Sequence, residues 1–129
     1  MLGAIAGDII GSVYELNNIK NKNFELFEPN SRFTDDSVLT VATMDSIING
    51  KPFNESYRDW FRKYPNVGFG GSFIKWAMSE EMRPYNSYGN GSAMRVSPIG
   101  FYYNSIDEVL IKAGKCATSH NKFSGVKQL

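Results

Sequence analysis

The apolar residues of this 129-residue chain recur at helical spacing along almost its whole length. Between residues 2 and 15, apolar side chains stand at positions 2, 5, 6, 9, 10 and 13, which lie on one face of a helix. Strand-like alternation of apolar and polar residues is almost absent. The sequence therefore predicts an all-α fold that forms one domain from residue 1 to residue 129. Further helices are predicted at about residues 35–49, 54–64, 71–82 and 106–118.

Residues that favour helix ends mark the boundaries of these helices. A glycine and a proline shortly after residue 49 end the helix 35–49. Apolar residues on most sides of that helix predict a central position for it. Asn54 and Ser72 stand where each can cap the helix that follows. Ser105, with Glu108 three residues later, has the pattern of a capping box.

The first predicted helix carries two unusual faces. Gly3, Gly7 and Gly11 recur at intervals of four residues and form a stripe along it. Because each glycine costs a helix about 1 kcal/mol relative to alanine, the stripe predicts that another element packs very close to this backbone. Asp8 and Glu15 are about two helical turns apart, so both are expected to point the same way.

Composition and charge narrow the possible classes of function. With 42% hydrophobic and 21% charged residues, the chain is typical of a globular protein. Its formal net charge is +1 and it has no basic run, so nothing indicates nucleic-acid binding. Cys116 is the single cysteine, which excludes a disulfide within the chain and is expected to pack in the core. No secretion signal or membrane span is expected, so the predicted location is the cytoplasm.

Two adjacent acids, Asp35 and Asp36, follow Thr34 at the start of a largely apolar helix. One interpretation is structural: Thr34 or an Asp caps the helix, and acids in the first turn meet the positive end of its dipole. The other is a divalent cation, since carboxylates and a hydroxyl supply the oxygen ligands that Mg²⁺ prefers. Both can hold together, and the local pattern does not decide between them.

The segment 83–100 is too rich in glycine, asparagine and serine to predict regular structure, and its length suggests a functional loop. Its part from Ser87 to Met94 is either a simple turn or a backbone cradle for a phosphate. From their local sequence alone, Glu15 is an ordinary surface acid and His120 an ordinary polar loop residue.

Five segments, taken in order, together resemble the ADP-ribosylglycohydrolase family, also called the dinitrogenase reductase-activating glycohydrolase family. They read GAIAGDIIGSVYE, FTDDSVLT, YPNVGFGGSFIKWA, SYGNGSAMRVSPIG and KCATSHN. The likeness extends from Leu2 to about Lys127. It implies an all-α protein that removes ADP-ribose from modified groups with a pair of Mg²⁺ or Mn²⁺ ions.

Carried over by position, the resemblance implies roles for particular residues. Thr34, Asp35 and Asp36 match the family's first cluster of metal ligands. Glu15 matches the glutamate of a mobile loop that closes on the substrate, and we count it as catalytic together with Asp35 and Asp36. His120 matches a histidine beside the substrate ribose. The residues that match the loop binding diphosphate and ribose are Ser87, Tyr88, Gly89, Asn90, Gly91, Ser92 and Met94.

The chain departs from the family pattern beyond these motifs. Family members are much longer, and their second metal cluster, an Asp-Thr-Asp-Thr-like motif near the C-terminus, has no counterpart here. We therefore expect a truncated domain that binds one Mg²⁺ or Mn²⁺ ion weakly, or none. Helices 2–15 and 35–49 are apolar on sides that the rest of a relative would cover. A second copy of the chain, or another protein, is the expected partner.

Three interpretations of the function stay open. The first is a hydrolase that acts on an ADP-ribosylated target and is completed by forming a homodimer. The second is a catalytically inactive homologue that binds an ADP-ribose-like ligand or a protein, for example a phage-encoded inhibitor of host defence. The third is a truncated gene product without a selected function. The core-facing pattern is unbroken, which weighs against the third.

Overall fold

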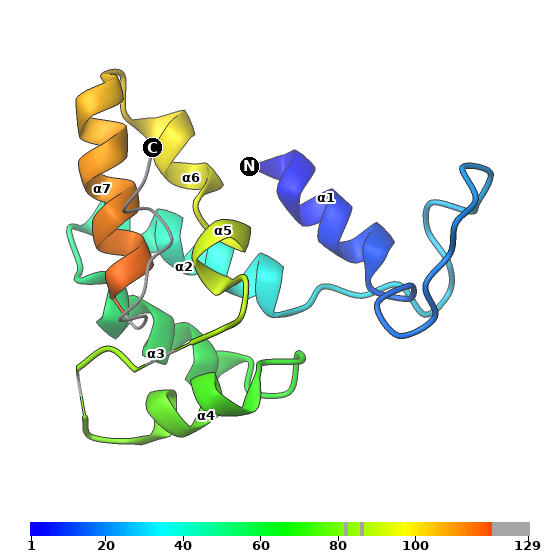
Figure 1. Cartoon of the computed structure of the whole chain (residues 1–129), viewed down its shortest axis with the longest axis horizontal. Coiled ribbons are helices and arrows are strands. Elements are labelled where there is room, and N and C mark those ends of the chain that lie inside the picture. The colour runs from blue at the N-terminus through cyan, green and yellow to red at the C-terminus, as the bar shows by residue number, and fades with distance from the viewer. Residues whose placement is uncertain (82, 86, 120–129) are drawn as a thin grey trace.

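The computed structural model describes residues 1–81, 83–85 and 87–119. All the secondary-structure elements in these ranges are α-helices. The all-α prediction is therefore confirmed. In Figure 1, α2 runs through the middle of the molecule, with α3 and α4 below it, α6 and α7 on the left and α1 on the right. The helices are α1 (Leu2–Gly11), α2 (Asp35–Asn49), α3 (Phe53–Lys63), α4 (Gly71–Met78), α5 (Gly91–Met94), α6 (Ser97–Tyr102) and α7 (Ile106–Thr118).

Helix α2 has the central position predicted for it, because it contacts α1, α3, α5 and α6. At its start, the Thr34 hydroxyl accepts a hydrogen bond from the backbone N–H of Asp36 at 3.3 Å. At its end, Gly50 takes a φ of 63°, a left-handed conformation that favours glycine, and its N–H bonds to the carbonyl of Ser46. Local sequence therefore defines both ends of this helix.

The hydrophobic core lies mainly where α2, α3, α4, α6 and α7 meet. Stacked and edge-to-face rings fill its lower part: Phe61 and Phe69 are 5.2 Å apart between ring centroids, and Phe69 and Phe73 are 5.0 Å apart. Cys116 is fully buried, which confirms that it packs in the core. The buried cluster comprises Val38, Leu39, Ala42, Tyr57, Phe61, Phe69, Phe73, Trp76, Ala77, Ile99 and Cys116.

Two of the predicted helix caps are wrong. Helix α3 begins at Phe53 directly after Pro52, and no side chain caps it, so Asn54 lies inside the first turn. Proline has no N–H to satisfy and a φ already close to that of a helix, which suits a helix start. Helix α4 begins after Gly70, whose carbonyl accepts the N–H of Ile74 at 3.0 Å, so Ser72 is not its cap.

The capping residue predicted for the last helix is correct, whereas the long irregular loop is not entirely irregular. Ser105 Oγ accepts the backbone N–H of Glu108 at 3.2 Å at the start of α7. Two short helices form in the segment 83–100: α5, which lies inside it, and α6, which begins in it and continues to Tyr102. The carbonyl of Asn90 accepts the N–H groups of Ala93 and Met94, which closes the turn of α5.

Helix α1 differs from its prediction in two ways. It ends at Gly11, so Glu15 lies in the turn that follows and not on the helix. A Cβ atom added at Gly3, Gly7 or Gly11 would meet nothing within 4 Å, so no described element packs against the glycine stripe. Ile5 and Ile9 of α1 line an apolar groove of about 200 Å³ with Val38 and Val41 of α2.

None of the helices formed by the described residues is both long and apolar enough to cross a membrane.

Candidate functional site

The start of α2 is held by a carboxylate from another helix. Asp8 of α1 accepts the backbone N–H and the hydroxyl of Thr34, at 2.8 and 2.5 Å. It also accepts the backbone N–H and the hydroxyl of Ser37, at 3.1 and 2.5 Å. These two N–H groups are among those left without partners at a helix start. Asp8 was missing from the candidate residues, and its polar position on α1 was the only sequence signal for it.

Asp35 and Asp36 follow on the first turn of α2 and are half-buried. Burial raises the pKa of Asp35 to about 7, and the charge of Asp36 adds to this effect. Burial also raises the pKa of Asp36, as do the charges of Asp8 and Glu15. Asp8, Glu15, Asp35 and Asp36 therefore form one acidic site around the start of α2. The repulsion among these four carboxylates would be relieved by a bound proton or a cation.

The glycine-rich segment before α4 shapes the surroundings of Asp35. The carbonyl of Val67 accepts the backbone N–H of Asp35 at 3.1 Å. Gly68 has a φ of 103°, and a Cβ there would lie 3.7 Å from Asp35 Oδ1. The positive φ favours glycine, and the missing side chain leaves the carboxylate uncovered on that side. The segment from Val67 to Gly71 therefore lies against Asp35, and Gly70 and Gly71 line a cleft together with it.

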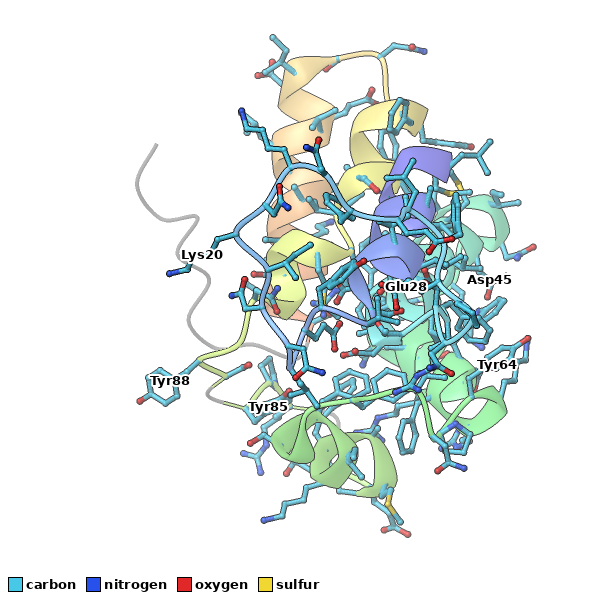
Figure 2. The ribbon with its side chains drawn as sticks, turned by 90° about the vertical axis from the view of Figure 1, so that its right-hand side faces the viewer. Lys20, Glu28, Asp45, Tyr64, Tyr85 and Tyr88 are labelled. Atoms are coloured by element: carbon cyan, nitrogen blue, oxygen red, sulfur yellow. The ribbon has the colours of Figure 1, made fainter. Side chains whose placement is uncertain are left out.

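A cleft of about 310 Å³ joins Asp35 to the loop after residue 86. Ser87, Tyr88, Gly89, Asn90, Gly91 and Met94 line it, so one wall comes from the loop matched to ADP-ribose binding. The start of α4 forms another wall. In Figure 2, Tyr88 points away from the body of the molecule, whereas Tyr85 lies beside α4. The remaining lining residues are Leu39, Gly70, Gly71, Ser72, Phe73, Tyr85 and Arg95.

The structure brings most of the predicted site residues to one region. Ser92 lies in α5 directly after Gly91 but does not line the cleft, and neither do Thr34 and Asp36. Glu15 is exposed in the turn after α1, close enough for its charge to act on Asp35 and Asp36. The prediction for His120 falls outside the described residues.

Arg95 contributes to the wall of the cleft, and sequence reasoning missed it. Its side chain is fully buried, with Nη2 donating to the carbonyl of Cys116 at 3.0 Å. Its guanidinium also lies over the ring of Tyr57, 4.4 Å from the centroid. An arginine between Met94 and Val96 in an otherwise apolar stretch was the only sequence sign of a buried charge. Arg95 places a fixed positive charge behind the cleft, on the side of the glycine-rich loop.

The acidic site offers oxygen ligands that fit a hard divalent cation. Asp35 and Asp36 supply carboxylates, and the Thr34 hydroxyl keeps one lone pair after donating to Asp8 and accepting from Asp36. In the described part of the chain, no group of three or more His, Cys, Asp or Glu side chains is arranged to hold a metal. A cation held by these oxygens would have to take its other ligands from water.

Comparison with known proteins gives a consistent result. The model of the ADP-ribosylglycohydrolase family matches residues 1–127. The chain is 27% identical to ADP-ribosylhydrolase ARH3 of Mus musculus and 25% identical to that of Homo sapiens, over 84% of its own length in both cases. These alignments cover 39% and 40% of the two relatives, so the chain spans about two-fifths of their length.

Proposed function

The chain belongs to the ADP-ribosylglycohydrolase family, and on this premise we propose that it binds ADP-ribose in the cleft between Asp35 and the loop 87–91. The observation that carries the proposal is the cleft itself, which has the acidic start of α2 on one side and the glycine-rich loop on the other. The proposed reaction is hydrolysis of the bond between ADP-ribose and a modified group, with the ribose to be released next to Asp35.

The residues of the chain divide this task between them. Backbone N–H groups of the loop from Ser87 to Gly91 bind the diphosphate, and the buried charge of Arg95 favours an anion there. Without a cation, Asp35 has a pKa raised to about 7, so its ionised form gains stability from a positive charge placed beside it. Asp36 and Glu15 place negative charge where a ribosyl cation develops in the transition state.

We also propose that Thr34, Asp35 and Asp36 hold one Mg²⁺ or Mn²⁺ ion. When bound, the ion would polarise ribose hydroxyls and activate water. The raised pKa values of the two carboxylates support this proposal, since burial and then neighbouring negative charges disfavour their ionised forms, and a cation would offset both effects. Calorimetric titration with Mn²⁺ is expected to give micromolar affinity or weaker, lost when Asp35 and Asp36 are both replaced by Ala. Two tightly bound ions per chain would contradict the proposal.

Binding and turnover are tested in parallel. Purified protein with Mg²⁺ is incubated with mono-ADP-ribosylated arginine and serine peptides, while ADP-ribose affinity is measured by calorimetry. Multiple turnovers that disappear in Asp35→Ala would establish a hydrolase. Asn90→Ala is expected to weaken ADP-ribose binding about tenfold without unfolding the protein, because the Asn90 side chain makes no capping bond. Asn104→Ala, an exposed asparagine before α7, serves as the control and should bind normally.

A second candidate function is that of a catalytically inactive homologue. The observation in its favour is that the described residues hold no cluster of three or more metal-binding side chains. Such a protein would retain ligand binding through the loop 87–91 and act as an inhibitor or decoy. ADP-ribose binding without release from either peptide would favour this candidate, and absence of both would favour protein–protein contact.

We further propose that the chain works as a homo-oligomer. Large apolar side chains lie exposed on α6 and α7, including Phe101 at 74%, Ile106 at 78% and Leu110 at 59% of full exposure. Leu2 on α1 is exposed as well. Exposed apolar side chains that gather on one face commonly mark an interface. The net charge of only +1 leaves little repulsion between copies.

A further inference from the structure

A second cleft lies next to the proposed ADP-ribose cleft and has no part in the function described so far. Its volume is about 720 Å³. Ser72 and Tyr85 line both clefts, so the two share a wall, whereas Asp35 lines only the first. The other residues around it are Lys75, Trp76, Ser79, Glu81, Arg83 and Pro84. The second cleft therefore extends the first one from the side of Ser72 and Tyr85.

The wall of this cleft is tied down by buried side chains. Arg58 of α3 donates to the carbonyls of Ser79 at 2.7 Å, Trp76 at 3.1 Å and Glu81. Trp76 Nε1 donates to the carbonyl of Arg83 at 3.2 Å. Because Arg58 and Trp76 are both about 5% exposed, these bonds are protected from water. The carbonyls of Trp76, Ser79, Glu81 and Arg83 are thus held by hydrogen bonds, which fixes this wall of the cleft.

The charges around the cleft favour an anion. Arg83 is paired with Glu81 through two bonds of 3.0 and 2.8 Å, so these two charges balance each other. Lys75 is exposed on α4 and makes no ion pair with any residue that the structure describes. The lining therefore carries one net positive charge. Tyr85 and Trp76, with ring centroids 6.2 Å apart, add aromatic surface beside it.

The orientation proposed for ADP-ribose in the first cleft determines which part of the ligand lies next to the second cleft. With the ribose to be released at Asp35 and the diphosphate on the loop 87–91, the adenosine is left for the part lined by Ser72 and Tyr85. We propose that the second cleft is a subsite for a phosphate carried on the adenosine ribose, held by Lys75. This proposal rests on the proposed function and narrows its ligands to ADP-ribose extended at the adenosine end.

The test compares two ligands that differ by one phosphate. Calorimetry at low ionic strength measures the affinity of the protein with Mg²⁺ for ADP-ribose and for ADP-ribose 2′-phosphate. The phosphorylated ligand is expected to bind about fivefold more tightly, as for a partly exposed ion pair. Lys75→Met should abolish this difference and leave the affinity for ADP-ribose unchanged. The matched control is Lys115→Met, because Lys115 is exposed on α7 and lines neither cleft.

Each outcome decides something. A preference for the 2′-phosphate that is lost in Lys75→Met and kept in Lys115→Met supports the subsite. Equal or weaker binding of the 2′-phosphate by the unmodified protein overturns it, as does an equal loss in both variants. If the subsite is overturned in this way but ADP-ribose itself still binds, the proposed function is not contradicted. If ADP-ribose itself does not bind, the proposed function fails and the subsite fails with it.

Discussion

At the residue scale, Asp8 shows how one side chain can connect two helices and prepare a site. Its carboxylate takes four hydrogen bonds from Thr34 and Ser37, the cap and third residue of α2. In a capping box, a glutamate of the same helix partners the cap N–H; here the acid comes from α1. As a result, Thr34 and Ser37 are tied to α1 on either side of Asp35 and Asp36.

Replacing this carboxylate tests its structural role. Asp8→Ala leaves the N–H groups of Thr34 and Ser37 without their partner and is expected to lower the free energy of unfolding by about 2 kcal/mol. Urea denaturation followed by circular dichroism measures the change. Asp107→Ala, an exposed acid in the first turn of α7, should cost less than about 0.5 kcal/mol. Equal costs for the two variants would mean that Asp8 does not anchor α2.

Asp35 gives the protein a stability that depends on pH. Its pKa is raised from 3.8 to about 7 in the folded state, mainly by burial, so the folded protein holds this proton more tightly than the unfolded chain. The stabilisation of the folded protein that comes from this proton is therefore complete below about pH 4 and is lost as the pH rises through 7. In EDTA, the thermal midpoint of unfolding should fall between about pH 5 and pH 8.

In the variant Asp35→Asn, residue 35 cannot ionise. The thermal midpoint of this variant should therefore decrease less between about pH 5 and pH 8. Asp107→Asn is the control and should keep the slope of the unmodified protein. A midpoint that rises over the same range in the unmodified protein would contradict the raised pKa of Asp35. Saturating Mn²⁺ is expected to reduce the fall as well, because a cation stabilises the ionised carboxylate.

At the scale of elements, Arg58 joins α3 to the end of α4. Replacing it by Met removes the donors to the carbonyls of Trp76, Ser79 and Glu81 and the charge that lies 4.6 Å from the Trp76 ring centroid. Unsatisfied buried carbonyls are costly, so Arg58→Met is expected to lower the free energy of unfolding by about 3 kcal/mol. Denaturant unfolding monitored by the fluorescence of Trp60 and Trp76 measures the loss.

Arg62 provides the matched control, since it lies one turn further along the same helix. Its side chain is 63% exposed and pairs with Asp59 at 3.0 Å. Such a surface pair contributes little, so Arg62→Met should change stability by less than about 1 kcal/mol. If both arginine variants cost the same, the hydrogen bonds of Arg58 do not hold the segment after α4.

At the scale of the whole molecule, the exposed apolar surface of α6 and α7 predicts association. Light scattering after size-exclusion chromatography is expected to give a dimer at micromolar concentration. Ile106→Asp places a charge in the surface and should produce a monomer. Leu16→Asp changes an even more exposed side chain, at 96% exposure, on the loop after α1, and should leave the dimer intact. A stable monomer of the unmodified chain would contradict the interface.

Much of the fold could be predicted because its signals are local. The ends of α2 follow from Thr34 and Gly50, and the start of α7 from Ser105, since a cap acts within one turn of its own helix. The caps of α3 and α4 were wrong where Pro52 and Gly70, residues without a capping side chain, allowed an earlier start. The loop 87–91 and Asp35 were identified by resemblance, and the structure brings them together in one cleft.

The sequence by itself determined that the chain is helical and where its central helix begins and ends. Only the tertiary structure decided which distant residues meet: Asp8 with Ser37, 29 positions apart, and Arg95 with Cys116, 21 positions apart. It also decided that no residue of the described ranges packs against the glycine stripe of α1. The physical reason is that periodicity and caps record interactions within a turn of helix. A buried charge or an uncovered face depends instead on which other elements pack there, and no local pattern encodes that.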